Sequence, residues 1–312
     1  MKKRKLGASD LAVSEVGLGC MSLGTEKNKA LSLLDEAIEL GINYLDTADL
    51  YDFGRNEEIV GEAIQNRRHD IILATKAGNR WEEGNRWEEG KEGWYWDPSK
   101  AYIKEAVKKS LTRLKTDYID LYQLHGGTME DNIDETIEAF EELKQEGVIR
   151  YYGISSIRPN VIKEYVRKSN ITSIMMQFSL LDRRPEEWLS LLEEHQISVV
   201  ARGPLAKGLL TEKPLEKAGD RVKQNGYLTY SYDELAHVRK SVSDIAPDLS
   251  MTELSLQYLL AQPAVTSVIA GASKIEQLKE NIKAAGARSL SGQEIKALQF
   301  YTKRDIYEAH RS

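Results

Sequence analysis

Short runs of β-branched and aromatic residues alternate along the chain with longer segments in which apolar residues recur every three or four positions. This alternation is typical of β–α–β units around a parallel sheet. We predict eight strands, at residues 16–18, 44–46, 71–76, 119–124, 151–155, 173–177, 198–202 and 266–270. Helices are predicted at residues 29–40, 101–114, 133–146, 160–168, 186–195 and 274–284.

The clearest helical pattern is in residues 133–146, where one buried stripe is formed by Ile133, Ile137, Phe140 and Leu143. Before the first strand, residues 3–6 and 11–13 flank the polar sequence Gly-Ala-Ser-Asp, which predicts a small hairpin. Two helices in addition to those of the barrel are expected at residues 252–261 and 292–301.

Eight strands with seven or eight intervening helices match a (β/α)8 TIM barrel in number and in length. A doubly wound open sheet is the structural competitor. It is disfavoured because no G-x-G-x-x-G follows the first strand: Gly17-Leu18-Gly19 runs on into Cys20-Met21. No linker divides the chain. We therefore predict one α/β barrel domain over residues 1–312, with an N-terminal β-hairpin and two extra helices.

Composition narrows the class of protein. The 43 basic and 49 acidic residues give a net charge of −6, which argues against nucleic acid as a partner. No apolar run approaches the roughly 20 residues of a membrane span, and the basic N-terminus is not followed by the apolar core of a secretory signal. The single cysteine, Cys20, excludes an intrachain disulfide and fits a reducing compartment. We expect a cytoplasmic protein with neither membrane nor nucleic acid as partner.

Polar residues stand where several predicted strands end, and in a TIM barrel those ends carry the active site. The second strand ends at Asp46 and is followed by Tyr51, the third ends at Lys76, and the fourth is followed by His125. Taken singly, a lysine closing a strand is more often solvated and a lone tyrosine is more often packed. Their shared end of the barrel favours one site.

The four side chains together suit proton transfer to an oxygen that gains negative charge. A tyrosine hydroxyl has an ordinary pKa near 10, and a neighbouring ammonium such as Lys76 favours its phenolate. Asp46 would hold Lys76 charged, and His125 would hydrogen-bond a substrate carbonyl oxygen. Carbonyl reduction requires such a proton transfer to the oxygen when a cofactor delivers hydride to the carbon.

These residues lie in longer motifs that resemble the aldo-keto reductase family. The segment from Asp46 to Tyr51, DTADLY, resembles the family's D-T-A-x-x-Y, and the resemblance continues in order to Asn281. The later matches are Thr75-Lys76, DLYQLH at 120–125, GVIRYYGIS at 147–155, Gln177, Gly203-Pro204-Leu205 and IAGA at 269–272. The resemblance implies a catalytic tetrad with Tyr51 as the general acid, made of Asp46, Tyr51, Lys76 and His125.

The resemblance also implies that NADP(H) binds in an extended pose without a Rossmann domain. The nicotinamide carboxamide would be held by Ser155, Ser156 and Gln177. Further contacts with the cofactor would come from Gly19, Cys20 and Met21 at the end of the first strand, from Asp46, and from Arg202 at the position that stacks on the nicotinamide. The pyrophosphate would pass Gly203, Pro204, Leu205 and Gly208. The adenosine end would meet Gly271, Ala272, Ser273, Lys274, Gln277, Glu280 and Asn281. Without the resemblance, the residues themselves favour a simpler interpretation: the two serines are a pair of hydroxyls at a strand end, Gln177 is a buried amide, and Lys274 is a solvated side chain.

The chain departs from the family pattern at four positions. Asp52 follows the tyrosine where glycine is common, and Ser156 stands where asparagine is common. Gln277 takes the place of the usual 2′-phosphate arginine, and Arg202 takes that of the aromatic residue that stacks on the nicotinamide. Because a guanidinium is planar but positively charged, we expect Arg202 to favour neutral NADPH over NADP+.

A tryptophan-rich insertion at residues 78–98 follows the third strand and contains the duplication NRWEEG-NRWEEG. Its tryptophans are Trp81, Trp87, Trp94 and Trp96. They would wall a pocket for aromatic or apolar carbonyls, or alternatively pack on the barrel exterior or belong to a mobile lid. A second irregular segment, residues 212–232, is polar and ends in three tyrosines. Both are expected to set substrate specificity.

Three functions are compatible with these observations. The first is NADPH-dependent reduction of small aldehydes and ketones to alcohols. The second is a cofactor-binding regulatory subunit, since potassium-channel β subunits share this fold and tetrad. The third is another TIM-barrel class, such as a metal-dependent isomerase, but no metal-ligand spacing emerges around the remaining histidines, so no metal is expected. Neither the physiological substrate nor the oligomeric state follows from the sequence.

Overall fold

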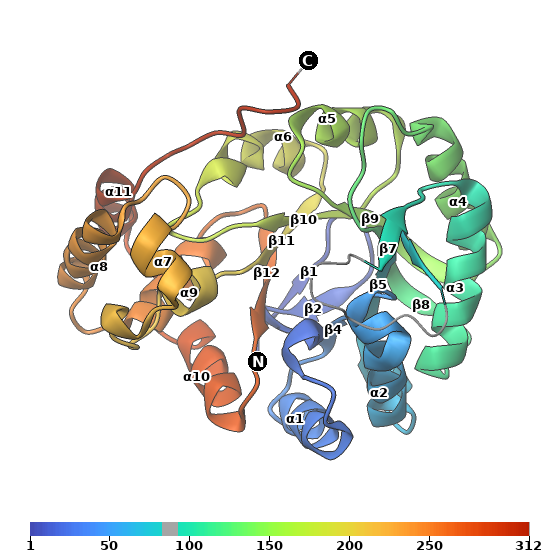
Figure 1. Ribbon diagram of the computed structural model, residues 1–312, viewed down its shortest axis with the longest axis horizontal. Coiled ribbons are helices and arrows are strands. Elements are labelled where there is room, and N and C mark those ends of the chain that lie inside the picture. The colour runs from blue at the N-terminus through green and yellow to red at the C-terminus, as the bar shows by residue number, and fades with distance from the viewer. Residues whose placement is uncertain (83–92, 312) are drawn as a thin grey trace.

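The computed structural model describes residues 1–82 and 93–311, and its centre is a closed barrel of eight parallel strands (Figure 1). The barrel closes where the last strand pairs with the first, with Ile269 opposite Gly17. All eight predicted strands are confirmed. They are β3 (Val16–Gly19), β4 (Tyr44–Asp46), β5 (Ile72–Ala77), β8 (Ile119–Leu124), β9 (Ile149–Ser155), β10 (Ser173–Gln177), β11 (Ser198–Arg202) and β12 (Val265–Gly271).

Helices surround the barrel because each parallel strand needs a crossover to reach the next. The predicted stripe on α4 is buried at all four of its apolar positions. None of the helices in residues 1–82 and 93–311 is long and apolar enough to cross a membrane. The ring consists of α1 (Lys27–Glu39), α2 (Arg55–Ile64), α3 (Lys100–Leu114), α4 (Ile133–Gln145), α5 (Pro159–Lys168), α6 (Leu189–Glu194), α9 (Met251–Leu260) and α10 (Ile275–Ala285).

Both segments expected as additional helices are helical, as α9 and as α11 (Gly292–Tyr301), but α9 takes a ring position because it packs against β12 and α10. The helix that lies beside α11 outside the ring is α8 (Tyr232–Ile245), which follows the short α7 (Asp220–Asn225) (Figure 1). The sequence analysis did not predict α8. Its signal was a capping box, in which Ser231 and Glu234 exchange side-chain and backbone hydrogen bonds.

The barrel interior is apolar at the N-terminal ends of its strands. The N-terminal hairpin, β1 (Lys3–Lys5) and β2 (Ala12–Ser14), contributes Leu6 and Leu11 to a cluster with inward side chains of the strands, including Tyr44 and Leu121. Packing is tight there: a Cβ on Gly17 would come within 2.5 Å of the Ile269 side chain. The hairpin therefore closes the barrel at the N-terminal ends of its strands.

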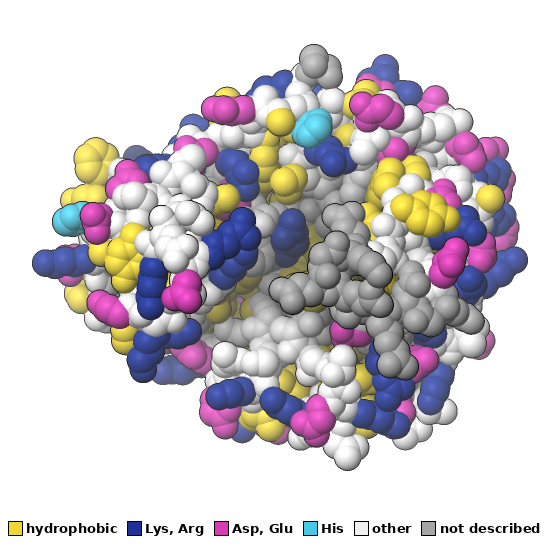
Figure 2. Space-filling view, viewed as in Figure 1, with side chains coloured by type: hydrophobic (Ala, Val, Ile, Leu, Met, Phe, Trp, Pro, Cys, Tyr) yellow, Lys and Arg dark blue, Asp and Glu magenta, His cyan; other side chains and the backbone are white. Residues whose placement is uncertain are grey.

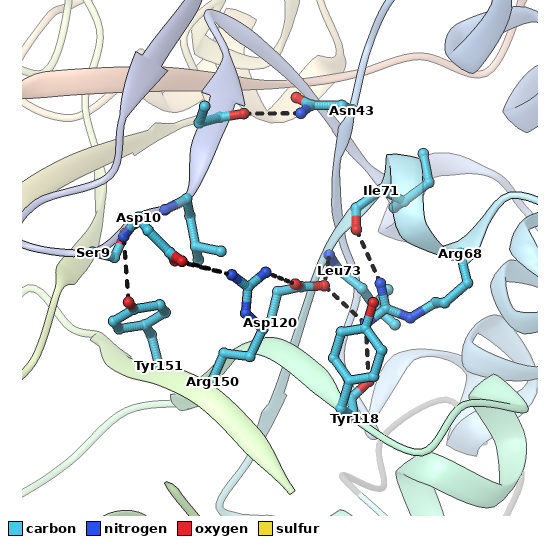
Figure 3. Close-up of polar contacts among 12 residues, drawn as sticks. Ser9, Asp10, Asn43, Arg68, Ile71, Leu73, Tyr118, Asp120, Arg150 and Tyr151 are labelled. Carbon is cyan, nitrogen blue, oxygen red and sulfur yellow. Dashed lines mark hydrogen bonds and ion pairs between the residues drawn. The ribbon is translucent and has the colours of Figure 1, made fainter. Parts of the chain in front are cut away.

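A polar network ties this hairpin to the barrel (Figure 3). Asp120, near the start of β8, is paired with Arg68 and with Arg150, each at 2.8 Å. The other guanidinium nitrogen of Arg150 reaches Asp10 of the hairpin at 2.9 Å, and the Asp10 backbone N–H donates to the Tyr151 hydroxyl. Because Asp120 is buried, its two arginine partners compensate its desolvation. This end of a TIM barrel contributes to stability.

Candidate active site

Strand alternation brings the candidate catalytic residues to one layer. Side chains two residues apart point to the same face of a strand, so Asp46 follows Tyr44 into the barrel and Lys76 follows Ala74. In the same way Gln123 follows Leu121 on β8, and it lies in register with Lys76. Polar side chains therefore form a layer directly above the apolar interior, at the carboxyl ends of the strands.

The centre of this layer is a buried ion pair. The Lys76 Nζ lies 2.5 Å from Asp46 Oδ1 and donates to the Thr47 carbonyl oxygen at 2.7 Å. The second carboxylate oxygen of Asp46 accepts from Gln123 Nε2 at 3.2 Å. Burial alone would lower the pKa of Lys76, but the negative charge of Asp46 and the hydrogen bonds to Asp46 and Tyr51 outweigh it and the pKa is raised. Lys76 is thus a fixed ammonium.

The Tyr51 ring lies against this ion pair. Lys76 Nζ is 5.1 Å from the ring centroid, and the His125 ring stands edge-on to it with centroids 5.9 Å apart. Burial raises the pKa of the Tyr51 phenol, and Asp46 adds to this, while Lys76 and Arg202 oppose it. Lys76 lowers the pKa of Tyr51, as expected from the sequence, but burial raises that pKa by more. The phenol therefore keeps its proton at neutral pH.

A left-handed turn holds Tyr51 in this place. The two residues after it, Asp52 and Phe53, have φ angles of 49° and 48°, and Gly54 has 84°. This region favours glycine, although aspartate visits it more readily than most residues. Asp52, at the position where the resemblance implies a glycine, therefore adopts the glycine-like conformation itself.

His125 is a neutral imidazole facing the cavity. Burial, together with the charges of Lys76 and Arg202, lowers its pKa to about 3. Its Nδ1 is buried and has no hydrogen-bond partner among the described residues. The backbone N–H of His125 donates to the Ala77 carbonyl oxygen at 2.8 Å, which fixes the start of the loop after β8.

Two cavities meet at this layer, and the barrel mouth is visibly hollowed at its centre, with Lys and Arg side chains beside the hollow (Figure 2). One cavity, of about 1050 Å³, is lined by His125, by Ser155 and Ser156, and by the C-terminal tail. The other, of about 730 Å³, runs from Asp46 and Tyr51 along the strand ends towards α10. Arg202 lines both cavities.

Most residues expected at the cofactor line the second cavity, while Ser155 and Ser156 line the first and Lys274 borders a separate smaller cavity with Lys29. Cys20 and Ala272 are buried beneath the surface of the groove. The residues that line the second cavity are Gly19, Met21, Asp46, Gln177, Arg202, Gly203, Pro204, Leu205, Gly208, Gly271, Ser273, Gln277, Glu280 and Asn281.

Gln177 is held in a network at the junction of the two cavities. Its Nε2 donates to Asp182 at 2.9 Å and to the Tyr227 hydroxyl at 3.4 Å, and its Oε1 accepts from Arg202 at 3.4 Å. The Asp182 carboxylate in turn binds Arg184 through two bonds of 2.7 Å. The amide therefore sits in a fixed orientation.

Sequence reasoning missed several residues at the site. Gln123 carried a signal, because it is a polar residue on the inward face of a buried strand, two positions after Leu121. The others lie on separate segments whose convergence depends on the tertiary fold. They are Arg158, Asp182, Arg184, Tyr227 and Arg304.

The tryptophan-rich insertion begins and ends as a hairpin of β6 (Asn79–Trp81) and β7 (Trp94–Trp96). Trp94 and Trp96 line the first cavity, and the Trp96 indole N–H donates to Asp131 at 2.8 Å. Trp81 instead packs edge-on against Phe53, with ring centroids 5.7 Å apart. Trp87 lies outside the described residues.

No group of three or more His, Cys, Asp or Glu side chains in the described part of the chain is arranged to hold a metal ion. The polar atoms of the site are instead an ion pair, a phenol, an imidazole and amides. This donor set suits proton transfer and hydrogen bonding to an oxygen substituent.

Comparisons with known proteins identify the family to which the chain is similar. The family model described as "Aldo/keto reductase family" matches residues 15–301. The chain is 83% identical over 312 residues, covering 100% of both chains, to the "Uncharacterized oxidoreductase YqkF" of Bacillus subtilis (strain 168). It is 32% identical to the "NADH-specific methylglyoxal reductase" of Escherichia coli (strain K12), covering 91% of this chain and 93% of that one.

Among solved structures, the holo form of aldo-keto reductase AKR11C1 from Bacillus halodurans superposes with a TM-score of 0.92 at 62% identity and covers 100% of both chains. The family consists of oxidoreductases that act on carbonyl compounds with nicotinamide cofactors. The fold, the tetrad motif and these matches lead to one assignment. The chain belongs to the aldo/keto reductase family.

Proposed function

We propose that the protein reduces aldehydes and ketones to alcohols with NADPH, and that Tyr51 donates the proton. The observation that carries the proposal is the convergence of a buried Asp46–Lys76 pair and His125 on one phenol, at the junction of two cavities. A reaction at this junction would have the substrate in the first cavity and the cofactor in the second.

The second cavity suits a dinucleotide. Its volume of about 730 Å³ lies in the range of cofactor sites, and Gly203 and Gly208, with φ angles of 66° and 88°, bring backbone close to the groove. Gln177 would bind the nicotinamide carboxamide. When bound, the reduced nicotinamide supplies the hydride.

The remaining cofactor contacts are proposed from the resemblance. Ser155 and Ser156 would complete the carboxamide site from the edge of the first cavity. The adenosine end would lie near Gln277, which accepts hydrogen bonds from the backbone and hydroxyl of Ser273. We favour NADPH over NADH because the groove reaches the N-terminus of α10, where a 2′-phosphate would meet backbone N–H groups, although Lys274 itself faces a separate cavity.

Tyr51 is better suited than His125 to donate the proton. His125 is neutral at pH 7, because burial and the neighbouring positive charges lower its pKa to about 3. The phenol is protonated, and Lys76 stabilises the phenolate that donation leaves behind. Neutral His125 would hydrogen-bond the substrate oxygen and orient it towards Tyr51.

Asp46 and Gln123 act on Lys76 rather than on the substrate. The Asp46 carboxylate holds the ammonium at 2.5 Å, and Gln123 holds the carboxylate. This chain of contacts would keep the charge in place while the phenol loses its proton. The names of the similar proteins, oxidoreductases and reductases, favour an enzyme over a regulatory subunit.

The test is a panel of small carbonyl compounds assayed by the loss of reduced cofactor, with NADPH and NADH in parallel. We expect turnover with NADPH at a higher kcat/KM than with NADH. Tight NADPH binding without consumption across the panel would contradict the proposal and favour the regulatory subunit. The cytoplasmic location, expected from the single cysteine, stays a prediction.

A further inference from the structure

The cavity beside His125 is rich in arginine. Its lining includes four guanidinium groups from four separate segments of the fold: the start of α5, the segment before α6, the end of β11 and the C-terminal tail. Among the described residues, the carboxylates that line the same cavity are those of Asp305 and Glu308. Guanidinium groups stay charged at every physiological pH. The arginines are Arg158, Arg184, Arg202 and Arg304.

Two of these charges already have partners. Arg184 is bound by both oxygens of Asp182 at 2.7 Å, and its guanidinium lies over the Tyr307 ring. Arg304 is mostly exposed and lies 4.0 Å from Glu186. Neither needs a ligand to balance its charge.

The other two have no such partner in the described part of the chain. In residues 1–82 and 93–311, no carboxylate lies within ion-pair distance of Arg158 or Arg202. Arg158 donates one N–H to the Gly127 carbonyl oxygen, and Arg202 makes one long bond to Gln177. The charge of Arg158 is felt by Glu130, whose pKa it helps to lower, but the two groups form no ion pair. Arg202 is exposed, and most N–H donors of both guanidinium groups have no acceptor among the described residues.

Both groups border the catalytic layer. Arg158 is anchored to Gly127, two residues after His125, and Arg202 is close enough to lower the pKa of Tyr51. The Asp46 carboxylate is already engaged by Lys76 and Gln123. Within residues 1–82 and 93–311, the positive charge of Arg158 and Arg202 at the mouth thus has no ion-pair partner.

We propose that the carbonyl substrate carries an oxyanion, a carboxylate or a phosphate, that Arg158 and Arg202 bind while its carbonyl oxygen faces Tyr51 and His125. This proposal rests on the proposed reductase function. Arg158 lines only the first cavity, so its charge serves the substrate rather than the cofactor groove. Guanidinium groups bind carboxylates and phosphates through paired N–H donors.

The test compares anionic and neutral aldehydes of similar size with NADPH at saturation. The pairs are 4-oxobutanoate against butanal, and glyceraldehyde 3-phosphate against glyceraldehyde. We expect kcat/KM to be about tenfold higher or more for the anionic member of at least one pair, and the pair that shows it identifies carboxylate or phosphate. Equal or better use of the neutral member in both pairs would overturn the proposal and leave the reductase function standing. If no aldehyde is reduced, the reductase function itself fails.

Arg158→Gln should reduce the anionic preference about tenfold or more, through KM, and Arg158→Lys should restore part of it. Arg167→Gln is the matched control, because Arg167 is an exposed arginine on the same helix, paired with Glu164; its preference should equal that of the wild type. An unchanged preference in Arg158→Gln would overturn the role of Arg158. If that variant does not fold, Arg158→Lys decides: a preference identical to the wild type would count against the guanidinium.

Discussion

Replacing Lys76 with methionine tests the buried ion pair on which the site is built. Methionine has nearly the length of lysine, so it fills the space without the charge. The substitution removes the ammonium at 2.5 Å from Asp46 and the donor to the Thr47 carbonyl. Both Lys76 and Asp46 are almost fully buried, with side-chain exposures of 0% and 4%. The carboxylate would be left with Gln123 as its one remaining side-chain donor in the described part of the chain.

The expected destabilisation is about 3–5 kcal/mol, the usual result of removing one partner of a buried pair. The double variant Asp46→Asn/Lys76→Met should be destabilised less than the sum of the two single variants, by about 2 kcal/mol or more. The effect should also depend on pH. Burial raises the pKa of Asp46, and loss of Lys76 raises it further. The folded variant then gains stability as pH falls through that raised pKa, because a neutral carboxyl needs no cation.

Equilibrium urea unfolding followed by tryptophan fluorescence measures these free energies. Lys108→Met, at an exposed position on α3, controls for the change of side chain and should leave the free energy of unfolding within about 0.5 kcal/mol. The penalty of Lys76→Met should shrink between pH 8 and pH 5. A loss below about 1 kcal/mol, additive single effects, or an equal penalty at both pH values would refute the reasoning.

Three further outcomes are expected. Gly61→Ala should lower the free energy of unfolding by about 1–3 kcal/mol, because its Cβ would lie 2.6 Å from the Leu114 backbone; an unchanged urea midpoint would contradict this. In the wild type, the pKa of His125 is about 3 in the folded protein and 6.5 in the unfolded chain. Because only the unfolded chain takes up this proton between pH 6.5 and pH 3, the free energy of unfolding falls by about 1.4 kcal/mol per pH unit over that range. His125→Gln should lack this slope in urea unfolding at pH 7 and 5, and equal slopes would count against it. Arg202→Tyr should lower the ratio of the NADP+ to the NADPH dissociation constant, measured by fluorescence titration; an unchanged ratio would show that the Arg202 charge does not discriminate.

Local patterns were sufficient to predict the barrel and which polar residues meet at the carboxyl ends of its strands, while the catalytic role of those residues stays a prediction. Each strand is a short apolar run, and the inward face of each can be read by counting in twos from residues such as Tyr44 to Asp46. Strand ends share one edge, so residues distant in sequence were expected to meet. The contacts among Asp46, Lys76 and Tyr51 agree with that expectation.

The remainder depended on long-range packing. The helix α8 is amphipathic, but it follows the irregular segment 212–232 and was found only in the structure. Lys274 follows β12 as expected, yet it faces a separate cavity, because side-chain direction in a loop has no simple period. The arginines of the first cavity come from segments about 20 to 150 residues apart, and nothing local to Arg158 or Arg304 indicated that they meet.

The central claim is that the proton comes from Tyr51, and Tyr51→Phe tests it most directly. The variant keeps the ring beside Lys76 and removes only the hydroxyl. NADPH binding, measured by quenching of tryptophan fluorescence, should stay within about threefold of the wild type, while kcat for a good aldehyde falls at least about a hundredfold. Turnover at the wild-type rate with intact cofactor binding would contradict the account.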